Sequence, residues 1–125
     1  MDAPATPHYA MPINALTSVL NRATGVALFG ASVGGGYLAL ASPDLSICVA
    51  SWAAAHPFLA VPARAAVVFP LAYHYAGGLR HLWWDAAKHG NQAAHEGPLE
   101  KGPVDTSSYA VLGASAAATV LAALA

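Results

Sequence analysis

Charged residues are scarce in this sequence. They make up 9% of the 125 residues, whereas hydrophobic residues make up 57%. A water-soluble domain is about 25% charged and needs polar residues to cover its large surface. The low charge therefore favours lipid as the surroundings of the chain, with a water-soluble alanine-rich helical bundle as the weaker alternative. The length corresponds to a single domain, 1–125.

Clustered cations and paired cysteines are also missing. The formal net charge is −1, so a basic face for binding nucleic acid is not expected. The single cysteine, Cys48, can form neither an intrachain disulfide nor an iron–sulfur cluster by itself, and we interpret it as an apolar structural residue. Residues 1–12 contain no Lys or Arg and so do not resemble a signal or transit peptide. Targeting is then internal, or it depends on a presequence that has been removed.

The sequence contains long runs of uncharged residues. Residues 23–41 and 106–125 contain no charge, and about 20 apolar residues are enough to cross the hydrocarbon layer. A further long run begins at Pro62, a residue suited to the first turn of a helix. The sequence therefore predicts an all-α integral membrane protein with three transmembrane helices at about 15–41, 62–89 and 106–125. Pro43 and the pair Gly90-Asn91 would end the first two.

The segments between these runs indicate the orientation of the chain. Residues 45–60 are apolar but short, and we expect them along the membrane interface, whereas the polar segment 88–105 is expected to be an aqueous loop. Cationic residues favour the cytoplasmic or matrix side. Four of the five cations would lie near the side of the N-terminus, which is therefore predicted to be inside: Arg22, Arg80, Lys88 and Lys101.

The stretch AYHYAGGLRHLWWD, residues 72–85, concentrates ionisable groups in the second predicted span. His74 would lie near its middle, where an ionisable side chain is costly and is a functional hypothesis by default. Gly77 and Gly78 follow on the same helix face and leave room for a flat ligand. A neutral imidazole is a common axial ligand to haem iron. The residues alone leave two alternatives, haem ligation or a hydrogen bond to a neighbouring helix.

His81 lies two helical turns beyond His74, about 10 Å along the axis, so both cannot ligate one iron. With Arg80 it is better placed for haem propionates or as a charge at the rim. Asp85 and His89 continue the stripe, but nothing in the chain clearly completes the shell of a separate metal site.

In the first predicted span, Ser18 and Arg22 share a helix face because they are four residues apart. Their hydroxyl and N–H groups can donate to the carbonyl oxygens of a polar headgroup. The alternative is that Arg22 reaches the phosphate headgroups of the membrane. Further along, Gly30 and Gly34 form a small-xxx-small pair, which predicts close packing against a partner helix or a cofactor.

Two stretches, SVLNRATG and YHYAGGLRHLWWD, together resemble the large cytochrome b anchor subunit of succinate dehydrogenase, respiratory complex II. The family pairs a Ser-x3-Arg-x-Thr/Ser-Gly motif with a second motif of His, Gly, an aliphatic residue, Arg-His and Asp. The second motif is the more specific of the two. The matching positions are Ser18, Arg22, Thr24, Gly25, His74, Gly78, Leu79, Arg80, His81 and Asp85.

The resemblance implies a membrane-anchor subunit of succinate:ubiquinone oxidoreductase that is not catalytic alone and has no catalytic residue of its own. His74 would ligate the iron of haem b, with the second axial ligand supplied by the smaller anchor subunit. The other implied roles are ubiquinone binding by Ser18, Arg22 and Asp85, and a haem environment formed by Arg80, His81, Gly77 and Gly78.

The implied partners are the small cytochrome b anchor subunit, the iron–sulfur subunit, the flavoprotein subunit and membrane lipids; FAD and the iron–sulfur clusters would belong to the partner subunits. The expected location is the mitochondrial inner membrane or the bacterial cytoplasmic membrane. The sequence departs from the family at Asn21, where a histidine is usual; a propionate contact from this position would be weakened. The main alternative is a haem-free membrane scaffold. A cytochrome that ligates haem within one chain would need a second midspan histidine, which the sequence lacks.

Overall fold

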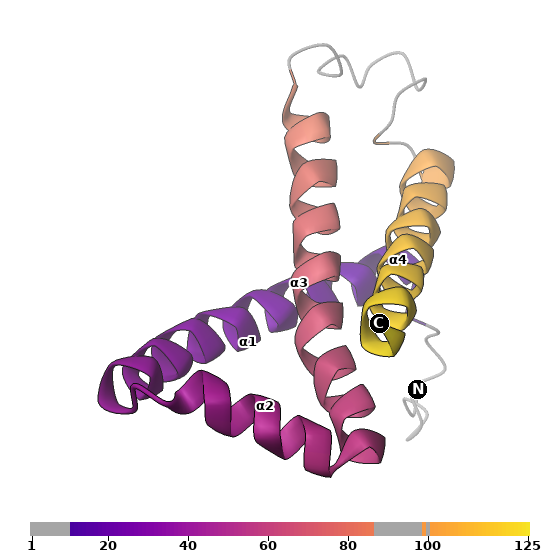
Figure 1. The fold of residues 1–125 in the computed structure, drawn as a ribbon. Helices are drawn as coiled ribbons and strands as arrows, with labels where there is room; N and C mark the ends of the chain where they lie inside the picture. The colour runs from indigo at the N-terminus through magenta and orange to yellow at the C-terminus, as the bar shows by residue number, and fades with distance from the viewer. Residues whose placement is uncertain (1–10, 87–98, 100) are drawn as a thin grey trace, which may run out of the picture.

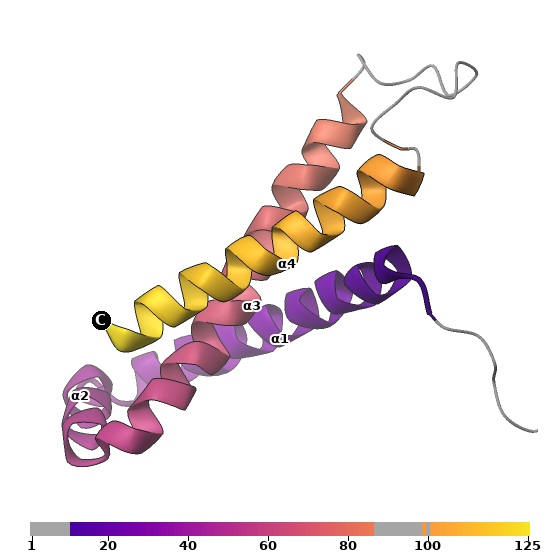
Figure 2. The same cartoon turned by 90° about the vertical axis from the view of Figure 1, so that its right-hand side faces the viewer.

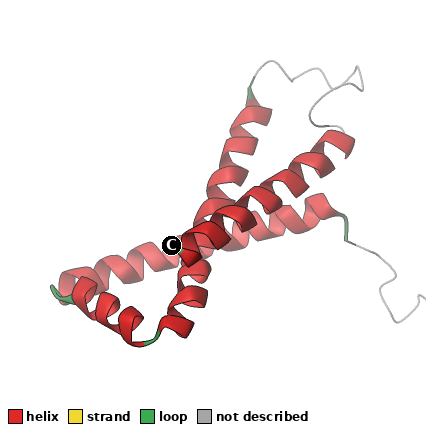
Figure 3. Ribbon diagram, turned by 45° about the vertical axis from the view of Figure 1, so that its right-hand side comes forward, coloured by secondary structure: helices red, strands yellow, loops and turns green. Residues whose placement is uncertain are grey.

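The computed structural model describes residues 11–86, 99 and 101–125, and the regular elements among them are all α-helices (Figure 3). α3 packs most extensively against α4, and α1 crosses α3 near its middle (Figures 1 and 2). α2 joins the far end of α1 to the beginning of α3 (Figure 1). The four helices are α1 (Ile13–Ala41), α2 (Leu45–Ala55), α3 (Pro57–Asp85) and α4 (Lys101–Leu124).

The first helix agrees closely with the sequence. α1 begins two residues before the predicted 15 and ends at the predicted Ala41. Its last turn closes when the Ser42 N–H donates to the Leu38 carbonyl at 2.9 Å, and Pro43 then prevents continuation. The short apolar segment that follows forms α2, an 11-residue helix.

The second predicted helix has different ends in the structure. α3 begins at Pro57, because this residue has the same first-turn advantage that we assigned to Pro62. Pro62 and Pro70 instead lie inside the helix. α3 ends at Asp85, before the predicted 89, and the proposed stop at Gly90-Asn91 lies outside the described residues.

The last helix is longer than predicted. α4 begins at Lys101, so residues 101–105, which were expected to be loop, are helical. Pro103 is tolerated there because the first turn of a helix has no acceptor for its N–H groups. The rest of the predicted aqueous loop falls at 88–98 and 100, outside the described residues, and at Leu99, which lies in a turn.

Small and polar side chains occupy the contacts between the helices, and large apolar ones point outward. Tyr73 is the largest fully buried side chain among the described residues. Phe29 on α1 is 72% exposed and Leu40 is 88% exposed. This arrangement is typical of helices that associate in lipid, where close approach and hydrogen bonds replace the hydrophobic effect. The other buried residues are Thr17, Thr24, Ala60, Gly77, Ser108, Ser115, Thr119 and Ala123.

Two of the helices, α1 and α4, are long and apolar enough to cross a membrane, judged by length and composition. α3 has 29 residues but does not meet the same criterion. Its two arginines, two histidines and internal prolines lower its hydropathy. The structure thus agrees with the all-helical prediction, and two of the three expected spans have the composition of a span.

Candidate functional site

His74 lies where α3 crosses α1, and its ring is partly buried. The ring Nδ1 is 3.0 Å from the main-chain carbonyl oxygen of Asn21. A carbonyl oxygen only accepts hydrogen bonds, so the neutral ring carries its proton on Nδ1. The Nε2 atom then keeps its lone pair for another partner.

Gly25 makes room for this ring. A methyl group in place of its α-hydrogen would lie 2.8 Å from Cε1 of His74, closer than ordinary carbon atoms approach. The preceding residue, Thr24, is buried and donates its hydroxyl to the carbonyls of Leu20 and Asn21 at 2.9 Å and 3.0 Å. The Asn21 carbonyl therefore accepts from both Thr24 and His74, and the ring orientation is fixed from α1.

The two glycines after His74 have different surroundings. A methyl group at Gly77 would collide with Oδ1 of Asn21, so the Asn21 amide occupies the space that this glycine leaves. That Oδ1 atom is buried and has no hydrogen-bond partner among the described residues. Gly78 has no atom near the position of an added methyl group, so its face is open in this chain. Within this chain, Asn21 therefore fills the space beside Gly77, and the face beside Gly78 is open.

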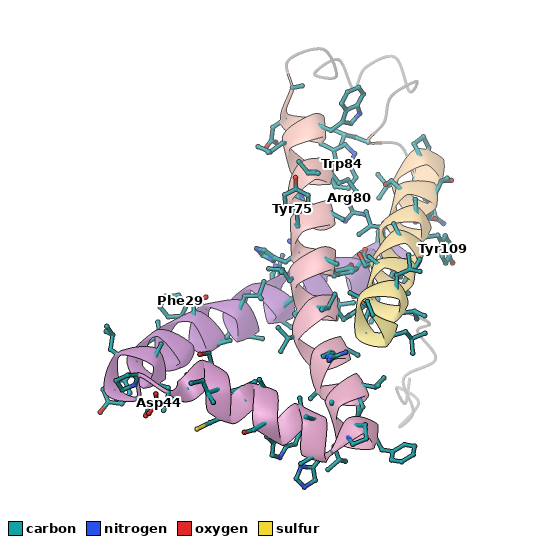
Figure 4. All side chains as sticks on the ribbon, viewed as in Figure 1. Phe29, Asp44, Tyr75, Arg80, Trp84 and Tyr109 are labelled. Atoms are coloured by element: carbon teal, nitrogen blue, oxygen red, sulfur yellow. The ribbon has the colours of Figure 1, made fainter. Side chains whose placement is uncertain are left out.

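Arg80 extends from α3 toward α4 (Figure 4). Its Nη1 donates to Oγ of Ser108 at 2.8 Å, and its guanidinium carbon lies 4.6 Å from the ring centre of Trp84. This is within the range of a cation–π contact. At Nε, Arg80 also carries a buried N–H group that has no acceptor in the described part of the chain.

A polar network that the sequence reasoning missed joins three helices beside His74. Tyr73 donates its hydroxyl to the Thr17 carbonyl at 3.0 Å. The Thr17 hydroxyl is 3.2 Å from that of Ser108, which also accepts from Arg80. The sequence contained one indication of this network: polar residues occur within runs of span length. Such residues are expected to form hydrogen bonds with neighbouring helices.

The remaining predicted site residues lie apart from this network. Ser18 is partly buried and Arg22 is exposed; each follows directly after a residue that contacts α3. His81 is exposed and lies edge-on to Trp84 with ring centres 5.2 Å apart. Asp85, at the end of α3, is about 16 Å along the helix from His74. Within the described part of the chain, no hydrogen bond or ion pair joins Asp85 to Arg22 or Ser18.

A separate metal site is not supported by the described residues, which contain no group of three His, Cys, Asp or Glu side chains in suitable positions. His89 lies outside them. The groups that fit a haem are instead a single imidazole with a free lone pair and a buried arginine N–H without an acceptor. An imidazole nitrogen is a common ligand of haem iron. An arginine N–H commonly donates a hydrogen bond to carboxylates such as the haem propionates.

Comparison with known proteins assigns the chain to a family. The family described as "Succinate dehydrogenase/Fumarate reductase transmembrane subunit" matches residues 3–122. The chain belongs to this family. The resemblance inferred from the two motifs is therefore confirmed. Membership of a transmembrane family also agrees with the outward-facing apolar side chains of the four helices.

Three relatives of this succinate dehydrogenase/fumarate reductase family illustrate the similarity. Each is a mitochondrial succinate dehydrogenase cytochrome b560 subunit. The protein from Dictyostelium discoideum is 36% identical over 86 residues, which cover 66% of this chain and 45% of that protein. The Bos taurus protein is 34% identical over 100 residues, covering 70% and 56%. The Homo sapiens protein is 34% identical over 97 residues, covering 68% and 54%. The chain spans about half the length of these relatives.

Proposed function

We propose that this chain is a cytochrome b membrane-anchor subunit of a succinate:quinone oxidoreductase. Its role is to attach a head carrying FAD and iron–sulfur clusters to the membrane, to supply one axial ligand to haem b and to form part of the ubiquinone-reduction site. The observation that carries the proposal is the His74 ring, which is held by the Asn21 carbonyl and Gly25 so that Nε2 keeps its lone pair. The cytochrome b560 names of the relatives support the haem.

The haem-facing residues of this chain have distinct tasks. His74 would ligate the iron through Nε2, and the hydrogen bond at Nδ1 fixes the tautomer and the orientation of the ring. The guanidinium of Arg80, together with the neighbouring His81, would hold a propionate of the haem. Gly78 leaves the helix face open, whereas Gly77 accommodates Asn21. Bound haem supplies reversible one-electron chemistry.

The proposed quinone site uses Ser18 and Arg22 at the beginning of α1. Their hydroxyl and guanidinium donate to the carbonyl oxygens of ubiquinone and stabilise negative charge on them during reduction. Asp85 is the last residue of α3 and lies at the same end of this helix as Arg80. Its carboxylate can accept and release a proton there. No described contact pairs Arg22 with a carboxylate, so its guanidinium is free to bind the acceptor.

We further propose that α3 is the third membrane span, with the N-terminus on the matrix or cytoplasmic side. Its 29 residues extend about 43 Å, which exceeds the roughly 30 Å hydrocarbon layer. Most of its ionisable residues lie in the last third, near the end that faces the quinone site. The other axial ligand would come from a small cytochrome b subunit. The iron–sulfur and flavoprotein subunits would bind on the N-terminal side, in the mitochondrial inner membrane or the bacterial cytoplasmic membrane.

The test consists of two substitutions in the purified complex, each with its own control substitution. His74→Ala is expected to remove the b-type band from the reduced-minus-oxidised spectrum, whereas His56→Ala, at the junction of α2 and α3, leaves it unchanged. Arg22→Ala is expected to abolish succinate-dependent quinone reduction while the soluble head still reduces an artificial dye. Lys101→Ala is the matched control for Arg22.

The outcomes separate the proposal from its alternative. A native complex without a b-type band would identify a haem-free scaffold. Unchanged quinone turnover after Arg22→Ala would show that the quinone binds elsewhere. A b-type band that survives His74→Ala would assign the ligand to another residue.

A further inference from the structure

Two adjoining cavities that open to the outside of the chain lie between the end of α1, α2, the first half of α3 and the end of α4, with volumes of about 630 Å³ and 360 Å³. They share Val49, Ala53 and Arg64. In Figure 1, α1, α2 and the first half of α3 form a triangle, and the crossing of α1 and α3 is one of its corners. Arg64 is ten residues before His74, about 15 Å along α3, so the cavities are separate from the proposed haem and quinone residues.

The walls of these cavities are almost entirely apolar, with three exceptions. Ser42 and Ser46 line the larger cavity, and neither hydroxyl makes a hydrogen bond to a described residue. Arg64 lies on the boundary between the two cavities. The remaining lining residues are chiefly Ala and Val, with Trp52 in the smaller cavity. The combined space is therefore amphipathic: it has apolar walls, with hydroxyl donors on one side and a guanidinium on the other.

Arg64 has no partner that would balance its charge within the described residues. It is exposed, and no hydrogen bond, ion pair or ring contact involves its guanidinium. Asp44 is the acidic residue nearest in sequence to the cavity-lining Ser42 and Ser46, but it does not line either cavity and makes no ion pair with Arg64. On our proposal that α3 spans the membrane, a guanidinium there is stabilised by an anion or by water within reach. An anion from outside the chain would also balance its charge.

We propose that these cavities bind one phospholipid molecule, whose phosphodiester contacts Arg64 and whose acyl chains lie in the apolar spaces. Arginine binds phosphate oxygens well because its N–H groups form two parallel hydrogen bonds. Ser42 and Ser46 add hydroxyl donors on the opposite wall. A soluble phosphate would leave the apolar walls without a partner, whereas a phospholipid matches both chemistries. The site is independent of the proposed haem and quinone functions.

The experiment counts the phospholipid that stays bound to the complex after delipidation in detergent, by native mass spectrometry. Arg64→Gln is expected to remove one tightly bound phospholipid per complex. Arg64→Lys, which keeps the positive charge, and Lys101→Gln, which changes an exposed cation at the start of α4, are expected to retain it. Retention of the full lipid count by Arg64→Gln would overturn the proposal.

A second variant leaves the charge in place and fills the shared space. Ala53→Phe adds bulk where both cavities meet and is expected to lose the same lipid. Adding phosphatidylglycerol to the delipidated wild-type complex is expected to raise its thermal denaturation midpoint, with no such rise in Ala53→Phe. An equal rise with inorganic phosphate would identify a simple anion site. Displacement of the lipid by a short-chain quinone would identify a second quinone site. Either result contradicts the proposal.

Discussion

The two halves of α1 use the same kinds of residues for different purposes. In the half up to Gly25, Thr17 and Thr24 are buried, and Gly25 lies against the ring of His74. In the half beyond it, no residue is buried, and Gly30 and Gly34 have no atom near the position of an added methyl group. The first half thus builds a site within the chain, whereas the second half presents a surface for lipid or another subunit.

The physical reason for the difference is the crossing of the helices. α1 touches α3 where they cross and then diverges from it toward α2 (Figure 1). α2 has only 11 residues and cannot cover the diverging half. The close packing predicted from Gly30 and Gly34 is therefore not found within the described chain. A glycine pair shows that another helix can approach α1 closely. Whether a helix is present there depends on where α1 and α3 cross.

The largest effect, a loss of bound haem, is expected when a glycine in the first half of α1 is replaced by a larger residue. Gly25→Val would place side-chain carbons against Cε1 of His74 and push the imidazole away from its position on the Asn21 carbonyl. We expect at least about a tenfold loss of haem occupancy, or about 1.4 kcal/mol. The measurement is the pyridine haemochrome content of the purified complex.

Gly30→Val is the control for this prediction, because it adds the same bulk to the open half of the same helix. Its haem content should stay within about 20% of the wild-type value, since it is outside the crossing. Equal haem loss in both variants would mean that α1 responds as a whole and that the contact at Gly25 has no special role.

A smaller effect is expected at the neighbouring pair Gly77 and Gly78. Gly77→Ala would force the Asn21 amide to move, which should destabilise the complex by about 1 kcal/mol. Gly78→Ala meets no atom of this chain, but it narrows the face that we propose for the haem, so it should lower the haem content. The thermal denaturation midpoint of the haem-depleted complex should therefore fall for Gly77→Ala and stay near the wild-type value for Gly78→Ala.

A double substitution checks the cause of this difference. Asn21→Ala removes the side chain that Gly77→Ala displaces, so the two changes together should cost less than their sum. If the costs simply add, the loss at Gly77 comes from some other contact.

The sequence predicted the helices well, whereas the ligand role of His74 and the roles of its motif neighbours stay predictions. Uncharged runs located α1 and α4, and His74 was found because an ionisable residue stood within an apolar run. Helix starts were less accurate, because Pro57 and Pro62 carry the same local signal. The contact between His74 and the Asn21 carbonyl was not predictable, since it joins residues 53 positions apart through a main-chain atom. The same holds for Thr17 and Ser108, which are 91 positions apart.

The smallest effect concerns the polar contacts that hold α4 to the crossing. Ser108→Ala removes the acceptor shared by Thr17 and Arg80, whereas Ser107→Ala removes only a bond to the Val104 carbonyl in the same helix. Hydrogen bonds between membrane helices contribute about 0.6 kcal/mol each on average, so Ser108→Ala should lower the thermal denaturation midpoint slightly and Ser107→Ala should not. Because Arg80 loses a direct acceptor, the haem band should also shift or broaden in the Ser108 variant if Arg80 contacts a propionate. A lowered midpoint with an unaltered band would limit Ser108 to helix association.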